Sequence, residues 1–288
     1  MIDGPLVTVG LQFFNNETTL RQAIQSVLNQ SYQNWEFILH DDGSQDRSLE
    51  IACNFRDSRI RIFTDSVNRK RPERLNQSLR LSKGKYYAVM DGDDVSYPDR
   101  LSKQVEYMEE NPAVDLLGAG MIVFDNAGKP IGKRIPPASH EKICAKPWSG
   151  FPMAQPTFMG RTDWFKKHNY DRRALGAVED QDLLLRAYQS SRFANMPDIL
   201  VGYREVGLYL KKIIIGRYFF SRNLIRQFRR EGRVSLAILA AAGQCLKTSV
   251  DCIAAGTGLK YHILRHRARP ITNEEKEEWL RVWNFLNR

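Results

Sequence analysis

The sequence lacks the cysteine and histidine patterns that mark zinc-bound or disulfide-stabilised domains. Its four cysteines form no Cys-x-x-Cys pair, and its five histidines show no spacing typical of metal ligands. We therefore expect neither a zinc site nor a disulfide framework, and a reducing compartment is the default for such a chain.

The chain also lacks a sequence typical of a signal peptide or of a membrane-spanning helix. The first five residues carry no basic segment and no long apolar stretch, so we expect no signal peptide. The longest apolar run, Val234 to Leu246, is 13 residues long and too short to span a bilayer. The motifs GxGxxG, GxxxxGK[ST] and GxSxG are absent as well, which argues against the nucleotide-binding and hydrolase classes that carry them.

Acidic residues are scarce only near the end of the chain. Residues 1–205 hold 27 basic and 27 acidic residues, whereas residues 206–288 hold 16 basic and 6 acidic ones. The whole net charge of +10 therefore lies in the last part. This asymmetry indicates a docking surface for something anionic, either a membrane or a nucleic acid.

Strand and helix patterns alternate through the first part of the chain. The apolar runs that predict strands are followed by segments with apolar residues at helical spacing, and this alternation predicts a mostly parallel α/β sheet. Ligands of such sheets bind at the carboxyl ends of the strands. We expect strands at residues 6–14, 35–40, 59–63, 86–90 and 199–203, with helices at 20–28, 49–55, 72–84 and 96–111.

Three acids follow one predicted strand directly. Asp91, Asp93 and Asp94 would repel one another unless a cation lay between them. Mg²⁺ and Mn²⁺ prefer such oxygen ligands and often bridge carboxylates to substrate phosphates. The alternative interpretation is a helix-capping turn with surplus acids, and the position after a strand favours the metal.

Two other acidic motifs have both a structural and a functional interpretation. Asp41-Asp42-Gly43-Ser44 is typical of a turn, or it could place a carboxylate against a nucleobase or ribose. Glu179-Asp180-Gln181-Asp182 opens a helical pattern, where the helix dipole stabilises acids, or it could supply a general base. The basic run at 69–71 could be a solvated loop or neutralise phosphates, and Gln155 could line an acceptor pocket or simply turn the chain.

Together these motifs resemble the inverting family 2 glycosyltransferases, which have the GT-A nucleotide-sugar fold. The similar stretches lie at residues 7–46, 75–112 and 177–187 and include HDDGSQD, MDGDDVSYPD and AVEDQDLLLRA. The resemblance covers roughly residues 5–205, and its specificity lies in the order and spacing of the motifs. It implies a GT-A catalytic domain at 1–205, with a nucleotide-binding half at 1–112 and an acceptor-binding half at 113–205.

The resemblance also implies roles for individual residues. Asp180 would be the catalytic base, with Gln155, Glu179 and Asp182 on the acceptor side. Asp91 and Asp93 would hold the metal. The donor nucleotide would be bound by Phe14, Asn15, Glu17, Asp41, Asp42, Arg71, Asp91 and Gly92. The chain departs from the family in having Gln12-Phe13 before these residues, and in lacking a histidine both near Gln155 and after Tyr203-Arg204.

The activity implied is transfer of a sugar from a nucleoside-diphosphate sugar, with UDP-sugars favoured, to a hydroxyl of a glycan or lipid-linked acceptor. The expected cofactor is Mn²⁺ or Mg²⁺, and the reaction would invert the anomeric configuration in a single displacement. Such a transferase would serve the synthesis of a cell-surface polysaccharide or glycolipid.

The basic region at 206–288 is predicted to be helical. Between 213 and 236 a helical wheel places apolar residues on one side and arginines on the other, and a second apolar stretch at 253–264 leads into basic residues at 265–269. Such a helix could lie on an anionic membrane or pack on the catalytic domain. Because the pattern repeats, we expect 206–270 to attach the protein peripherally to the cytoplasmic face of the inner or plasma membrane.

Three other functions are alternatives to a glycosyltransferase. A sugar-phosphate nucleotidyltransferase would carry a Gly-rich basic loop after the first strand, unlike Phe13-Phe14-Asn15-Asn16. A basic nucleic-acid- or membrane-binding protein could be built on a non-catalytic scaffold of the same fold, but no nucleic-acid recognition motif is apparent, so we expect no nucleic-acid partner. A degenerate scaffold would be expected to have lost Asp91, Asp93 or Asp180.

Overall fold

The computed structural model describes residues 4–173, 178–205, 210–256 and 269–287. Within these residues nine strands form one sheet, in the order β3-β2-β1-β4-β8-β6-β9-β5, with β7 paired to β6. The strands are β1 (Val7–Phe13), β2 (Trp35–Asp41), β3 (Ile60–Phe63), β4 (Tyr86–Asp91), β5 (Val95–Ser96), β6 (Leu116–Phe124), β7 (Pro130–Arg134), β8 (Met159–Arg161) and β9 (Phe193–Arg204).

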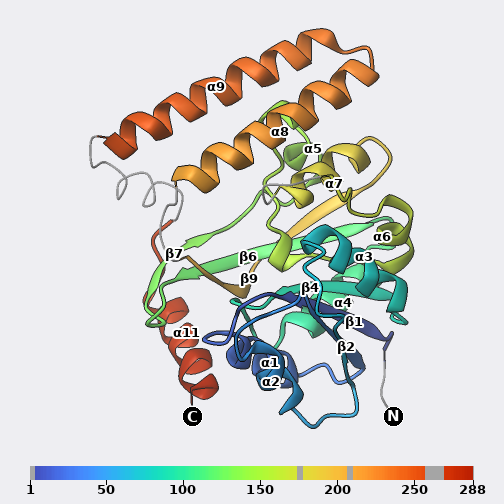
Figure 1. The fold of residues 1–288 in the computed structure, drawn as a ribbon, viewed down its shortest axis with the longest axis vertical. Helices are drawn as coiled ribbons and strands as arrows, with labels where there is room; N and C mark the ends of the chain where they lie inside the picture. The colour runs from blue at the N-terminus through green and yellow to red at the C-terminus, as the bar shows by residue number, and fades with distance from the viewer. Residues whose placement is uncertain (1–3, 174–177, 206–209, 257–268, 288) are drawn as a thin grey trace.

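Helices cover both faces of this sheet (Figure 1). They are α1 (Leu20–Leu28), α2 (Ser48–Cys53), α3 (Arg71–Leu81), α4 (Arg100–Glu110), α5 (His140–Ile143), α6 (Thr162–His168), α7 (Glu179–Ala187), α8 (Leu210–Arg230), α9 (Val234–Gly256) and α11 (Asn273–Leu286), with 3₁₀ turns η1 (Pro147–Ser149) and η2 (Gln155–Thr157). The strands and helices expected between residues 6 and 111 are all present, with boundaries shifted by a few residues. Their apolar periodicities match the faces that are buried.

Strands β3, β2, β1 and β4 are parallel, and their register sets the position of the acidic motifs. Phe13 at the end of β1 lies opposite Asp41, and Gln12 lies opposite Asp91. The carboxyl ends of β2 and β4 therefore flank that of β1 at one edge of the sheet. The sequence motifs that follow these strands consequently meet there, as the parallel arrangement requires.

The helices beyond residue 205 pack on the rest of the chain in two places. Helices α8 and α9 form an antiparallel pair on one side, and α11 lies against the far part of the sheet (Figure 1). Phe220, Leu224 and Phe228 of α8 are buried in the same cluster as residues of α6 and α7. Trp279 of α11 is fully buried against Phe124 of β6.

The predicted amphipathic helix at 213–236 is divided in the structure. The chain turns at Gly232, which has φ +71°, a conformation that glycine adopts without strain. The apolar side chains of α8 also lie on different sides, because Phe220 is buried whereas Tyr218 is 64% exposed. The second apolar stretch and its basic neighbours, at 253–269, lie mostly outside the described residues. Among the described helices none is both long enough and apolar enough to cross a membrane.

Candidate active site

A cluster of carboxylates lies just beyond the end of β4. Oxygen atoms of Asp91, Asp93 and Asp94 all lie within 4.8 Å of one another. Burial raises the pKa of Asp93 and of Asp94, and the neighbouring carboxylates raise both further. The buried Oδ2 of Asp94 has no hydrogen-bond partner among the described residues. Clustered hard oxygen donors of this kind fit a divalent cation.

Arg204, at the end of β9, holds the turn that carries these acids. Its Nε donates to the backbone oxygen of Asp93 at 2.8 Å, and its backbone N–H donates to Asp94 Oδ1 at 2.9 Å. The guanidinium lies over the rings of Phe124 and Trp283, at 4.7 and 5.4 Å from their centroids. Arg204 therefore positions the acidic turn, a role that we did not predict. The available clue in the sequence was the Tyr203-Arg204 pair at the end of a predicted strand.

Arg71 connects the acidic turn to the first turn of α7. Its guanidinium pairs with Asp91 and lies 3.3 Å from Glu179 Oε1. Burial alone would lower the pKa of Arg71, but Asp91, Glu179 and Asp180 raise it above its ordinary value. The structure thus brings together three predicted motifs, of which the first and the last lie more than 100 residues apart in sequence.

Asp180 follows Glu179 and is partly buried. Burial and the adjacent Glu179 raise the pKa of the Asp180 carboxyl to about 6. Gln181 donates a long hydrogen bond of 3.5 Å to Asp180 Oδ2, and its own Oε1 accepts from the backbone N–H of Phe151. A weakly engaged carboxylate with a raised pKa has the properties of a general base.

Asp41 and Asp42 are both buried and engaged at the end of β2. Asp42 accepts from Arg74 Nε at 2.9 Å and from the backbone N–H groups of residues 69 and 70 at 2.7 and 3.1 Å. Asp41 accepts from Ser44 N and Thr64 Oγ1. Both carboxylates therefore order the segment that leads into α3 and so help to place Arg71. The donor-binding role expected for them remains a prediction.

The residues expected at the start of the donor site link the loops after β1 and β2. Asn15 has φ +54° and exchanges hydrogen bonds with Ser44 and Gln45. Glu17 accepts from the backbone N–H of Arg47, at the start of α2. Phe14 is 43% exposed, so its ring is accessible for stacking.

Three further predicted site residues, Gln155, Gly92 and Asp182, each make contacts of a different kind. Gln155 is buried in η2, and its Nε2 has no hydrogen-bond partner among the described residues. Gly92 accepts from Thr19 Oγ1 through its backbone oxygen, at 2.9 Å. Asp182 pairs with Arg186 at 2.8 Å, and Arg186 in turn donates to the backbone of His168. In the structure Asp182 thus stabilises the packing of α6 against α7.

Sequence comparisons point to one family. The family described as glycosyl transferase family 2 matches residues 8–168. EpsE of Bacillus subtilis (strain 168), named as a glycosyltransferase, is 36% identical over 211 residues, which cover 71% of this chain and 75% of EpsE. WfgD of Escherichia coli, named as a UDP-Glc:alpha-D-GlcNAc-diphosphoundecaprenol beta-1,3-glucosyltransferase, is 31% identical over 136 residues, 47% of this chain and 53% of WfgD.

Solved structures show the same fold. TarS 1-349 of S. aureus in complex with UDP-GlcNAc gives a TM-score of 0.63 at 16% identity, covering 97% of this chain and 80% of that chain. The mannosyltransferase PcManGT from Pyrobaculum calidifontis, in complex with GDP-Man and Mn²⁺, gives 0.60 at 15% identity, covering 99% and 87%. The GT-A fold expected from the sequence is thereby confirmed.

Proposed function

This chain belongs to glycosyl transferase family 2, and we propose that it is an inverting enzyme that transfers a sugar from a nucleoside-diphosphate sugar to a hydroxyl of a glycan or lipid-linked acceptor. The observation that carries the proposal is the ion-pair chain from Asp91 through Arg71 to Glu179, beside Asp180. It joins an acidic cluster suited to a cation with a carboxylate suited to act as a base. The alternative of a non-catalytic scaffold has no comparable support.

The donor side is the edge formed by the ends of β1, β2 and β4. The exposed ring of Phe14 suits stacking on a nucleobase, and Oδ2 of Asp42, which accepts one hydrogen bond from the backbone, can accept a further one. The name of WfgD includes UDP-Glc, TarS was solved with UDP-GlcNAc, and PcManGT was solved with GDP-Man. Among these a UDP-sugar is the donor that we propose.

Asp91 and Asp93 would hold a divalent cation, Mn²⁺ or Mg²⁺, with Asp94 behind them. When bound, such an ion supplies positive charge that stabilises the leaving diphosphate. The mutual repulsion of the three carboxylates and the unpartnered Oδ2 of Asp94 support this assignment. Arg71, already within the cluster, would contribute a second positive charge to the diphosphate.

Asp180 would accept the proton of the acceptor hydroxyl. The hydroxyl oxygen then forms a bond to the anomeric carbon from the face opposite the diphosphate, while the bond from that carbon to the diphosphate oxygen breaks. One displacement inverts the configuration, so an α-linked donor gives a β-linked product. The β-linkage in the name of WfgD agrees with this outcome for a relative.

A nucleotide panel tests the donor and the metal together. Thermal unfolding is measured with UDP, GDP, dTDP and CDP, with and without Mn²⁺, because a ligand at about 100 times its Kd stabilises the folded state by about 2.7 kcal/mol. We expect UDP with Mn²⁺ to give the largest shift. Asp93→Asn should lose the Mn²⁺ effect, while Asp163→Asn, at an exposed position on α6, should keep it. Equal shifts with all nucleotides, or no effect of Mn²⁺, would contradict the proposal.

We further propose that α9 attaches the protein to an anionic bilayer. Phe220, Leu224 and Phe228 of α8 are used in packing on the protein, whereas several apolar side chains of α9 are exposed. Helix α8, which packs against α9, carries the exposed arginines 222, 229 and 230. Apolar side chains beside cations suit the interface of an anionic membrane. The exposed apolar residues of α9 are Val234, Ile238, Leu239, Leu246, Val250 and Ile253.

Liposome sedimentation tests this attachment. The wild-type protein should sediment with vesicles that contain phosphatidylglycerol and much less with pure phosphatidylcholine. The double variant I238E/L246E should bind about tenfold more weakly, because two exposed apolar side chains no longer enter the interface. Ile131→Glu, which makes one such change at an exposed apolar position on β7, is the control for each single variant, I238E and L246E. Equal binding by the double variant, or a concentration-dependent dimer that hides α9, would contradict attachment to the membrane.

A further inference from the structure

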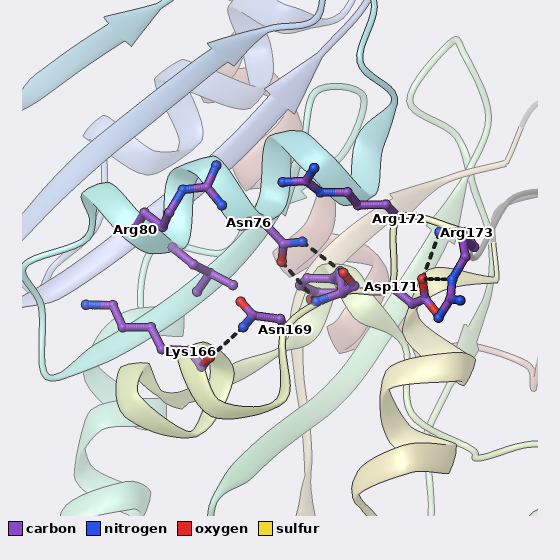
Figure 2. Close-up of a pocket in the computed structure, with 9 residues that line it drawn as sticks. Asn76, Arg80, Lys166, Asn169, Asp171, Arg172 and Arg173 are labelled. Atoms are coloured by element: carbon purple, nitrogen blue, oxygen red, sulfur yellow. Dashed lines mark hydrogen bonds and ion pairs between the residues drawn. The ribbon is translucent and has the colours of Figure 1, made fainter. Parts of the chain in front are cut away.

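An open cavity of about 710 Å³ lies along the side of α3 that faces the end of α6 and the segment after it. Figure 2 shows Arg80 and Lys166 at one end of it and Arg173 at the other, with the guanidinium of Arg172 extended toward that of Arg80. Four of the nine residues that line the cavity are therefore cations, and only one, Asp171, is an acid. Neither the donor site nor the proposed membrane face includes these residues.

Two acids order the arginines without neutralising the cavity. Glu73 pairs with Arg80 at 3.2 Å and with Arg172 at 2.5 Å, while Asp171 pairs with Arg173 at 2.8 Å. The three arginine side chains remain 56%, 68% and 69% exposed. A guanidinium has five N–H donors, so each of them can still donate to a ligand. Together with Lys166, the cations leave a surplus of two positive charges over the two carboxylates.

The backbone beneath these side chains is fixed by a buried contact. Asn76 of α3 donates its Nδ2 to the backbone oxygen of Tyr170 at 2.8 Å and accepts from the Tyr170 N–H at 2.9 Å. Asn76 is 5% exposed, and the two bonds tie the segment that carries residues 171–173 to α3. The backbone that carries Arg172 and Arg173 is thus held beside α3, which carries Arg80 (Figure 2).

Helix α3 carries residues of both the cavity and the active site. Arg71, in the active site, begins that helix, and Asn76 and Arg80 come five and nine residues later. At a rise of 1.5 Å per residue these positions lie about 8 and about 14 Å along the helix from Arg71. A chain-like acceptor whose terminal hydroxyl reaches Asp180 could therefore extend along α3 and place its earlier units in the cavity.

We propose that this cavity binds an anionic group, a phosphate or a carboxylate, on the acceptor glycan, behind the unit that accepts the sugar. Arginine forks and a lysine are the side chains best suited to such oxyanions, and charge-assisted hydrogen bonds to them are stronger than neutral ones. The assignment to the acceptor rests on the proposed transferase function, whereas the binding of the anion does not. The acceptor class is accordingly an acidic glycan.

Isothermal titration of the full chain at low salt provides the test. The probes are tetragalacturonate, which has a carboxylate on each sugar, neutral maltotetraose, and inorganic phosphate. We expect tetragalacturonate to bind, and R80Q/K166Q/R172Q to weaken it by about tenfold or more, since the loss of even one charge-assisted contact costs about a factor of ten. The control R222Q/R229Q/R230Q removes the same charge from α8 and should change the affinity by about twofold or less.

Each alternative result has a defined meaning. Equal losses in both triple variants would reduce the effect to overall charge and overturn the proposal. Maltotetraose binding as tightly as tetragalacturonate would overturn recognition of an anion, and inorganic phosphate binding as tightly would overturn the assignment to a glycan. UDP titration of the same variants serves as the reference. If UDP fails to bind the wild-type protein while tetragalacturonate binds, the proposed transferase function fails and the anion site stands.

Discussion

Replacing Asp180 with asparagine is expected to lower kcat by about 10²- to 10⁴-fold, the range typical of a lost general base. The amide is similar in size but cannot accept the proton of the acceptor hydroxyl. Because Asp180 does not pair with Arg71 or with the acidic cluster, the Kd for UDP should stay within about twofold of the wild-type value. Steady-state transfer and UDP titration measure the two quantities separately.

Asp163→Asn is the matched control for this variant, because it makes the same chemical change at an exposed position of α6. It should leave both kcat and the Kd for UDP unchanged. Near-normal turnover by Asp180→Asn would contradict the assignment of the base. Loss of UDP binding together with turnover would indicate that Asp180 acts on the donor side instead.

The pH profile gives a second measure of the same group. Burial and Glu179 raise the pKa of Asp180 to about 6, so the carboxylate is the main form only above that pH. A base must be deprotonated to act, and kcat/KM should therefore fall about tenfold per pH unit below about pH 6. The residual activity of Asp180→Asn should lack this limb. A wild-type profile that stays flat down to pH 4 would contradict the raised pKa.

The parallel part of the sheet, from β1 to β4, was predictable because its signals are local. The strand from Val7 and the strand from Tyr86 are rich in apolar residues, and Pro98-Asp99 directly precedes the next helix, a sequence typical of a helix start. Parallel pairing then brings the motifs after each strand to one edge, which is why Asp41, Asp42 and the cluster at Asp91 were found near one another.

What could not be predicted depends on contacts between distant segments. No periodicity indicates that Arg71 pairs with Glu179, or that Arg204 holds the backbone of Asp93. The helical wheel of α8 separated apolar from basic residues, but burial follows the partner surface, and Phe220 turns inward while Tyr218 does not. Local patterns gave the candidate site residues, whereas the contacts that position them could be found only in the folded chain.

Helix α11 is a further case, since the basic composition after residue 205 gave no reason to expect it in the core. Trp279 is fully buried, and its Nε1 donates to the backbone oxygen of Gly128 at 2.7 Å. Its ring contacts Phe124 at 4.5 Å between centroids, and Phe124 lies directly under the guanidinium of Arg204. The C-terminal helix thereby supports the residue that positions the acidic turn.

Trp279→Ala is therefore expected to destabilise the protein by about 3–5 kcal/mol, the range for truncating a large buried aromatic side chain. Both the cavity left by the ring and the backbone oxygen of Gly128, which loses its hydrogen bond, contribute to this loss. A loss of this size is a large part of the roughly 5–15 kcal/mol that stabilises a typical domain. Urea unfolding measures it, with Phe285→Ala as the control, because Phe285 lies on the same helix but is 44% exposed. That control should change stability by less than about 0.5 kcal/mol.

The same variant should weaken the Mn²⁺-dependent stabilisation by UDP, since Phe124 and Arg204 lose their support beneath Asp93. The comparison is made at a temperature where Trp279→Ala remains folded, so that stability and binding are read separately. A variant as stable as the wild type would show that α11 does not pack as the structure has it. A destabilised variant that keeps the full Mn²⁺ effect would show that Arg204 holds the acidic turn without help from the helix.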